Sequence, residues 1–302
     1  MSSRWGWLVG EAAWGGLLVA GLLGSGQRVI ASDQFWMRWG DGRAELSGYQ
    51  ITTPRYGELR QGTVVLIYVT EDLDRRTLVK DDLGQVAKED RMTVLKLNHV
   101  LKFQTGIYPY SVMTSVFARL DEQHTFPPVK IALSSQEWCG HVYHVLRPAA
   151  GAVESELHSY FGAEGDRWVK VPIPSGTLYE DDLLIQLREL TGPFAGGKDW
   201  KGMMIPSLWS LRKAHQELKA VTASIQRERV MIGNQALNRF TVVREGDKRV
   251  IFVETGGAHR VMRWEGSDGE VALIKKTARL PYWTLNHLGD EKFLSKLGLT
   301  GL

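Results

Sequence analysis

Short runs of β-branched and aromatic residues recur along most of the chain, and they constrain its fold more than any other feature. Thr63–Thr70 (TVVLIYVT) has the length and composition of a single β-strand. Further runs follow at short intervals: Val94–Leu97, Tyr110–Leu120, Val129–Ser135, Trp138–Leu146 and Glu156–Phe161. This rhythm predicts a meander of antiparallel strands.

The same pattern returns near the C-terminus. It covers Phe240–Glu245, Arg249–Glu254, His259–Trp264 and Val271–Thr277, with turn sequences at 245–247 and 267–269. Strands and helices do not alternate, which argues against a parallel Rossmann-like sheet. We therefore expect a mainly β (β-rich α+β) protein, built as a strongly curved antiparallel sheet or open barrel with one or two packed helices.

One helical region interrupts the strands. Thr177 and Glu180 have the spacing of a capping box, four leucines between 183 and 190 form an apolar stripe, and Gly192-Pro193 ends the element. We expect a helix over Tyr179–Leu190 and a shorter one over Ser207–Gln216, whereas Leu218–Gln226 fits either a helix or a strand. Residues 32–302 then form one β-rich domain with a helical, Gly-rich insertion around 177–216.

The first 31 residues differ in kind from the rest. Arg4 precedes an apolar stretch, Trp5–Leu23, that only Glu11 interrupts, and Val29-Ile30-Ala31 suits a signal peptidase. This pattern predicts a cleaved signal peptide and a periplasmic or exported protein. The alternative is an uncleaved anchor in the inner membrane, since the apolar stretch is just long enough to span a bilayer.

The charge balance disfavours nucleic acid as a partner. The 302-residue chain has 37 Lys and Arg against 34 Asp and Glu, and the two signs are interspersed. A phosphate backbone is neutralised by a basic stripe, and none is present. The composition is 43% hydrophobic, which suffices for a large core.

Chemistry-bearing residues concentrate between Ser134 and His144 (SSQEWCGHVYH), which contains the only cysteine of the chain. On an extended strand, Glu137, Cys139, His141 and Tyr143 share one face, and Trp138, Val142 and His144 share the other. A single cysteine cannot form an intrachain disulfide, and we expect Cys139 to be packed in the core as a small apolar residue.

Two reactive interpretations of this stretch remain open. In the first, Cys139 is a catalytic nucleophile with His141, Glu137 or the more distant His158 as its partner. Side chains at i and i+2 stand about 7 Å apart, so the base would come from another strand. In the second, Cys139, His141 and His144 bind a metal ion, which requires a bulge at Gly140.

No motif implies a cofactor. Gly192–Asp199 comes within one residue of a phosphate-binding loop, but Asp199 replaces the magnesium-binding Ser or Thr, and the segment follows a helix instead of a strand. We expect a surface loop there and no cofactor.

Aromatic residues recur within the predicted strands. In a sheet that curls on itself, inward aromatics line an apolar cavity that suits a greasy ligand, although ordinary core packing uses the same residues. Our ligand-binding candidates are Trp138, Tyr143, Tyr108, Tyr110, Phe117 and Tyr160.

Several short segments together suggest a family. They include Pro54–Glu58 (PRYGE), Phe103–Ser111 (FQTGIYPYS), Ser135–Tyr143 (SQEWCGHVY) and Pro281–Trp283 (PYW). This set resembles an uncharacterised bacterial envelope family that automated naming labels a septum formation inhibitor of the Maf type. True Maf proteins are cytoplasmic α/β nucleotide pyrophosphatases, and the chain has neither their Ser/Arg-rich motif nor their alternation of elements. The resemblance implies an exported protein of unknown activity; the strand order is also similar to periplasmic lipoprotein-carrier half-barrels.

These observations favour noncatalytic binding of a hydrophobic or lipid-like small molecule. The competing hypotheses are a Cys/His-centred hydrolase or metal-binding protein that uses residues 137–144, and a structural partner in an envelope assembly. Membrane contact is expected only through the N-terminal segment.

Overall fold

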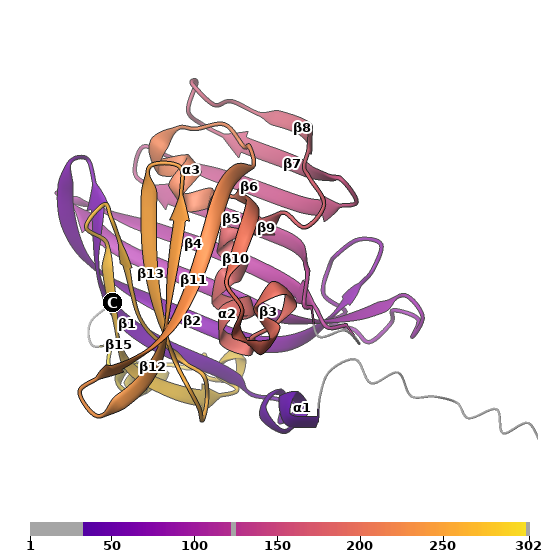
Figure 1. The fold of residues 1–302 in the computed structure, drawn as a ribbon, viewed down its shortest axis with the longest axis vertical. Helices are drawn as coiled ribbons and strands as arrows, with labels where there is room; N and C mark the ends of the chain where they lie inside the picture. Colours follow the sequence, from indigo (N-terminus) through magenta and orange to yellow (C-terminus); the bar gives the residue numbers. More distant parts are fainter. Residues whose placement is uncertain (1–32, 122–124, 300–302) are drawn as a thin grey trace, which may run out of the picture.

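A single curved sheet of fifteen strands accounts for most of the chain in the computed structural model, which describes residues 33–121 and 125–299 (Figure 1). The spatial order is β8-β7-β6-β5-β4-β3-β2-β1-β15-β14-β13-β12-β11-β10-β9. All neighbours pair antiparallel except β9 and β10, which are parallel. The predicted fold class, a strongly curved, mostly antiparallel sheet with few helices, is confirmed.

The N-terminal part of the chain forms one wall of the curved sheet. Its elements are α1 (Asp33–Trp39), β1 (Ala44–Arg55), β2 (Glu58–Asp74), β3 (Arg91–Thr105), β4 (Tyr108–Arg119), β5 (Pro128–Glu137), β6 (Gly140–Ala149), β7 (Ala152–Ser159) and β8 (Arg167–Pro172). They are joined as successive hairpins, as the meander predicts.

The C-terminal part forms the opposing wall and the helical insertion. Its elements are β9 (Leu178–Tyr179), η1 (Glu180–Asp182), α2 (Leu183–Glu189), η2 (Gly192–Gly197), β10 (Trp200–Ile205), α3 (Leu208–Ala214), β11 (Val221–Ile232), β12 (Gln235–Arg244), β13 (Asp247–Glu254), β14 (Val261–Gly266), β15 (Val271–Leu280), η3 (Tyr282–Thr284) and η4 (Asp290–Leu297). The segment 218–226, which the sequence left open, lies mainly in strand β11.

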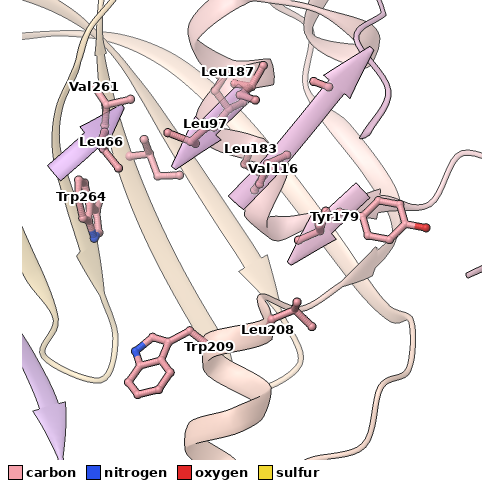
Figure 2. Packing of buried hydrophobic residues seen from close by; sticks show 14 of the residues in the cluster. Leu66, Leu97, Val116, Tyr179, Leu183, Leu187, Leu208, Trp209, Val261 and Trp264 are labelled. Atoms are coloured by element: carbon pink, nitrogen blue, oxygen red, sulfur yellow. The ribbon is translucent and has the colours of Figure 1, made fainter. Parts of the chain in front are cut away.

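Strand alternation divides the sheet into a concave face and a convex face. Concave-face residues such as Leu66, Leu97 and Val116 share one apolar cluster with Trp264 and Val261 from the opposite wall, and residues of α2 and α3 belong to the same cluster (Figure 2). All five side chains are at most 3% exposed. Burial of this apolar surface between the walls holds the curl closed.

The helical insertion differs from its predicted form at its start. Thr177 donates its hydroxyl hydrogen bond to the carbonyl of Pro174 and caps no helix. Glu180 instead accepts from the backbone N–H of Ser207 and pairs with Arg244, and the helix begins at Leu183. Ser207 does cap α3, since its hydroxyl accepts from the N–H of Ser210.

The C-terminal segment packs on the convex face. Leu297 and Leu299 form a second apolar cluster with Leu46 and Val69. A Cβ atom at Gly48 would lie 2.2 Å from the carbonyl oxygen of Leu297, so only glycine permits this approach.

Candidate ligand-binding site

A groove opens on the concave face between strands β5 to β8 and the end of α3. Its volume is about 380 Å³, within the range of about 300–1,000 Å³ that is typical of small-molecule sites. The strand residues that line it are Leu133, Val142, His144, Ser155, Leu157, Val169 and Val171. The register places Leu133, His144 and Leu157 directly opposite one another on three neighbouring strands, which explains why they share this face.

The groove floor is mainly apolar, with His144 and Ser155 as polar groups among its leucines and valines, and charged residues line the rim near Glu164. Leu211 and Leu218 face the strand residues from α3 and from the segment that follows it. Polar groups come from His144, Ser155 and the residues around Glu164. Such a lining suits a ligand with an apolar body and one polar group.

His144 and Ser155 form the polar contact within the strands. The Nε2 atom of His144 lies 2.8 Å from the Ser155 hydroxyl oxygen, and Ser155 is only 6% exposed. Burial lowers the pKa of His144 to about 4, so its imidazole is neutral near pH 7. The pair therefore offers a ligand neutral hydrogen-bonding groups.

Glu164 ties the β7–β8 loop to the end of α3 and closes one end of the groove. Its Oε1 atom lies 2.7 Å from a guanidinium nitrogen of Arg212 and 2.8 Å from Nδ1 of His215. The Arg212 guanidinium also lies over the Phe161 ring at 4.5 Å. Residues 48 positions apart in the chain thus build one wall of the groove.

A separate inner cavity of about 50 Å³ lies beneath η1, and both apolar and charged residues line it. His99, Asp181, Arg249 and Glu270 line it. Burial lowers the pKa of His99 to about 4 and raises that of Asp181 to about 7. This space suits a few water molecules and is too small for a lipid.

Cys139 lies at the exposed tip of a hairpin, so the expectation that it is packed in the core is wrong. Strand β5 ends at Glu137 and β6 begins at Gly140, which leaves Trp138 and Cys139 in the turn. Glu137 accepts a hydrogen bond from the backbone N–H of Cys139 at 2.6 Å. The hydrogen bond and charge of Glu137 raise the pKa of the Cys139 thiol, which disfavours the nucleophilic thiolate.

The candidate histidines lie on two faces of the sheet. His141 pairs with Gln136 and is exposed on the convex side, whereas His144 faces the groove. His158 also lies on the convex side, opposite Tyr143, and contacts Glu156 at 3.1 Å. Among residues 33–121 and 125–299, no three His, Cys, Asp or Glu side chains converge as a metal site.

The candidate aromatics separate into two sets. Trp138, Tyr108, Tyr110 and Tyr160 lie at one end of the sheet, where Tyr108 and Trp138 have ring centroids 6.3 Å apart. Tyr143 is 43% exposed on the convex face. Phe117 also faces that side, where Lys130 lies over its ring at 5.4 Å. None of the six lines the groove.

Sequence reasoning missed most of the groove. Leu133, Val142 and Leu157 alternate with polar residues, and this period is the signal that assigns them to the concave face. The partners that cover them, Arg212 and Leu218, carry no such signal because they depend on how the insertion folds back.

The helices within the described residues are all too short or too polar to span a bilayer. The predicted signal peptide or anchor, residues 1–31, lies outside those residues.

The chain matches no protein-family model, and no curated protein matches its sequence. It is similar in structure to a β-barrel-like protein of the domain of unknown function DUF1849 from Brucella abortus. The two share 9% sequence identity, the TM-score is 0.48, and the match covers 78% of this chain and 98% of that chain.

Proposed function

We propose that the groove binds a hydrophobic or lipid-like small molecule without chemically changing it. The observation that carries this proposal is a groove of about 380 Å³ with a mainly apolar floor that includes a few polar groups, set in the concave wall of the sheet. The apolar floor contributes the driving force, at about 0.8 kcal/mol for each CH₂ group removed from water before ordering costs.

The polar groups of the groove indicate which polar group a ligand can carry. His144 is neutral near pH 7, and the charges of Glu164 and Arg212 neutralise each other. A hydroxyl, amide or ester group is therefore favoured there over a strongly charged one, because it forms hydrogen bonds without adding a buried charge. An acyl chain that carries such a group has the required chemistry.

A Cys139-centred hydrolase has weaker support. Cys139 lies at an exposed tip and Glu137 raises its pKa, whereas the histidines that the sequence offered as its base lie along the strands. Nucleophilic catalysis requires a base within hydrogen-bonding distance that favours the thiolate, and Glu137 has the opposite effect. The binding hypothesis therefore remains the preferred one.

We also propose export to the periplasm and membership of the envelope family that the chain resembles. The apolar stretch Trp5–Leu23 and Ala31 support export. Expression of the full chain in a bacterium, followed by mass spectrometry of the fractionated protein, tests it. A periplasmic form that begins at Ser32 supports cleavage, an intact membrane-bound form supports the anchor, and an intact cytosolic form contradicts both.

A substitution that fills the groove with a large side chain tests whether ligands bind there. Leu157→Trp places an indole in the groove, whereas His158→Trp, one position along β7, places the same group on the convex face. We expect Leu157→Trp to weaken binding of the methyl ester of cis-parinaric acid, a fluorescent fatty acid, by about tenfold or more. His158→Trp should bind like the unchanged protein.

Native mass spectrometry of the unchanged protein, before and after solvent extraction, supplies the second readout. A co-purifying apolar molecule that Leu157→Trp loses and His158→Trp keeps supports the proposal. Equal binding by all three proteins, or no binding by any, contradicts it.

A further inference from the structure

A row of exposed aromatic side chains follows one rim of the sheet, outside the groove. Tyr56, Trp138 and Tyr160 belong to the tips of three hairpins and are 58%, 68% and 73% exposed. Tyr108, at the start of β4, lies between Tyr56 and Trp138 and is partly exposed. We call these four residues the aromatic row.

Buried residues hold the first half of the row in place. The Tyr56 hydroxyl lies 2.6 Å from that of Tyr110. The Tyr110 ring stacks on Phe103, with centroids 4.8 Å apart and planes within 4°. The Tyr108 and Tyr110 centroids are 6.1 Å apart, so the exposed rings rest on a packed aromatic base.

At the other end of the row, Gly140 leaves room for the ring of Tyr160. A Cβ atom at Gly140 would lie 2.6 Å from the ring of Tyr160. The Tyr160 ring therefore packs directly on the backbone at the start of β6, beside the Trp138 turn. Tyr160 is thus held against the neighbouring hairpin despite its exposure.

The spacing of the row follows from the sheet. Neighbouring strands lie about 4.8 Å apart, so successive hairpin tips repeat every ~10 Å along the rim. This distance is close to the length of one disaccharide unit in an extended, β-linked glycan. The hairpin tips have this repeat, whereas the rings of Tyr108 and Trp138 lie closer together, with centroids 6.3 Å apart.

We propose that the aromatic row binds a linear β-linked oligosaccharide. The faces of equatorially linked pyranose rings carry polarised C–H groups, which the negative face of an aromatic ring attracts. Arg55, whose guanidinium lies over Tyr56 at 4.3 Å, and Glu137, the partly exposed last residue of β5, flank the row with groups that hydrogen-bond to sugar hydroxyls. The site is separate from the groove and does not depend on the groove binding a lipid.

The charges on the rim favour a glycan over a membrane surface. Glu58, Glu137 and Asp166 stand at the same hairpin tips as Tyr56, Trp138 and Tyr160, where they offset the charges of Arg55 and Arg167. An anionic leaflet attracts Lys and Arg and repels these carboxylates. Uncharged sugar hydroxyls donate hydrogen bonds to carboxylates without that repulsion.

The test measures binding of chitohexaose and cellohexaose to the purified chain by isothermal titration calorimetry. We expect Trp138→Ala and Tyr160→Ala each to weaken binding by about tenfold, since one aromatic stack contributes up to about 1.5 kcal/mol. Tyr143→Ala and Trp168→Ala are matched controls, because both remove aromatics exposed on the convex side. These controls should change affinity less than twofold.

Gly140→Ala refines the test without removing an aromatic ring. Its added methyl group displaces the Tyr160 ring, so we expect a loss of about threefold while Tyr160 itself remains. Circular dichroism melting of every variant confirms that each is folded.

Three outcomes overturn the proposal. The first is that neither hexasaccharide binds the unchanged protein. The second is that the convex-face controls lose as much affinity as Trp138→Ala. The third is that vesicles of phosphatidylglycerol, and not the sugars, bind in a manner that depends on Trp138, which would assign the rim to a membrane.

Discussion

The two ends of the concave face differ in how far their ion pairs are exposed to solvent. At the end around α2, which we call the closed end, Arg188 and Glu45 pair at 2.5 Å with both side chains 1% exposed. At the groove, Arg167 and Glu217 approach to 3.5 Å, but their side chains are 47% and 86% exposed. The same ion-pair chemistry therefore seals one end and leaves the other accessible.

At the closed end, several contacts of Arg188 hold α2 in place. The Arg188 guanidinium lies over the Tyr68 ring at 4.4 Å and donates to the carbonyl of Ala258 at 2.9 Å. Burial alone lowers the Arg188 pKa, but the nearby Glu45 carboxylate raises it overall, so the charge persists. A buried charge with this many partners specifies a single position for the helix, whereas the groove rim specifies less and stays open to a ligand.

Loss of Arg188 should have the largest effect. Arg188→Met leaves the buried Glu45 without its closest fully buried cation, although Arg38 still pairs with it, and we expect a loss of about 3 kcal/mol in the free energy of unfolding. Urea unfolding followed by circular dichroism measures it. The double variant Arg188→Met with Glu45→Leu should recover part of the loss, and an unchanged midpoint in the single variant would show that the pair does not fix α2.

Apolar packing should show the same contrast between the two ends. Leu187 is fully buried in α2, and Leu187→Ala should cost about 3 kcal/mol of unfolding free energy. Leu157, partly exposed in the groove, should lose only about 1 kcal/mol when changed to Ala, because solvent already reaches it. Equal losses in the same urea experiment would mean that the groove is as tightly packed as the core.

The pH dependence of stability should be traceable to Asp182. Burial raises the pKa of Asp182 to about 8, so the folded state holds this proton in a range where the unfolded chain releases it. Asp182 therefore lowers stability as pH rises from ~4 to ~8, whereas the lowered pKa values of His99 and His144 act in the opposite direction between pH ~4 and ~6.5.

Asp182→Asn keeps the shape of the side chain and removes this titration. Gln186 lies 2.5 Å from the Asp182 carboxylate and can hydrogen-bond to either residue. We expect the variant to gain about 2 kcal/mol relative to the unchanged protein between pH ~5 and ~8. Thermal unfolding across that range measures the gain, and two parallel pH curves would show that Asp182 does not control it.

The sequence predicts the sheet well because most strands are recognisable from their own residues. Runs such as Thr63–Thr70 and Arg249–Glu254 fall within strands β2 and β13, and Ser207 caps α3 as its position suggests. Hydrophobic alternation and local caps depend on neighbours in the chain, so they can be read before the fold is known.

The site is harder to predict because it depends on contacts between distant residues. The sequence pattern predicts Cys139 on a strand, because the turn between β5 and β6 contains no Gly-Asn or Asp-Gly pair that would interrupt the alternation of side chains. Glu180 matched a capping box, but the fold uses it to bind Ser207 and Arg244. Glu164 and Arg212 meet only once the insertion has folded back over β5 to β8.

The smallest effect is expected at the exposed ion pair of the groove. Arg167→Met should change the free energy of unfolding by less than about 0.5 kcal/mol, because solvent screens a pair in which Glu217 is 86% exposed. Arg167 also donates to the carbonyl of Glu164 at 2.7 Å, and the backbone can exchange that bond for water at this exposed site. Urea unfolding measured beside Arg188→Met gives the contrast directly. A loss above about 1 kcal/mol would show that the groove rim is held as firmly as the closed end, and a ligand would then have to open it before binding.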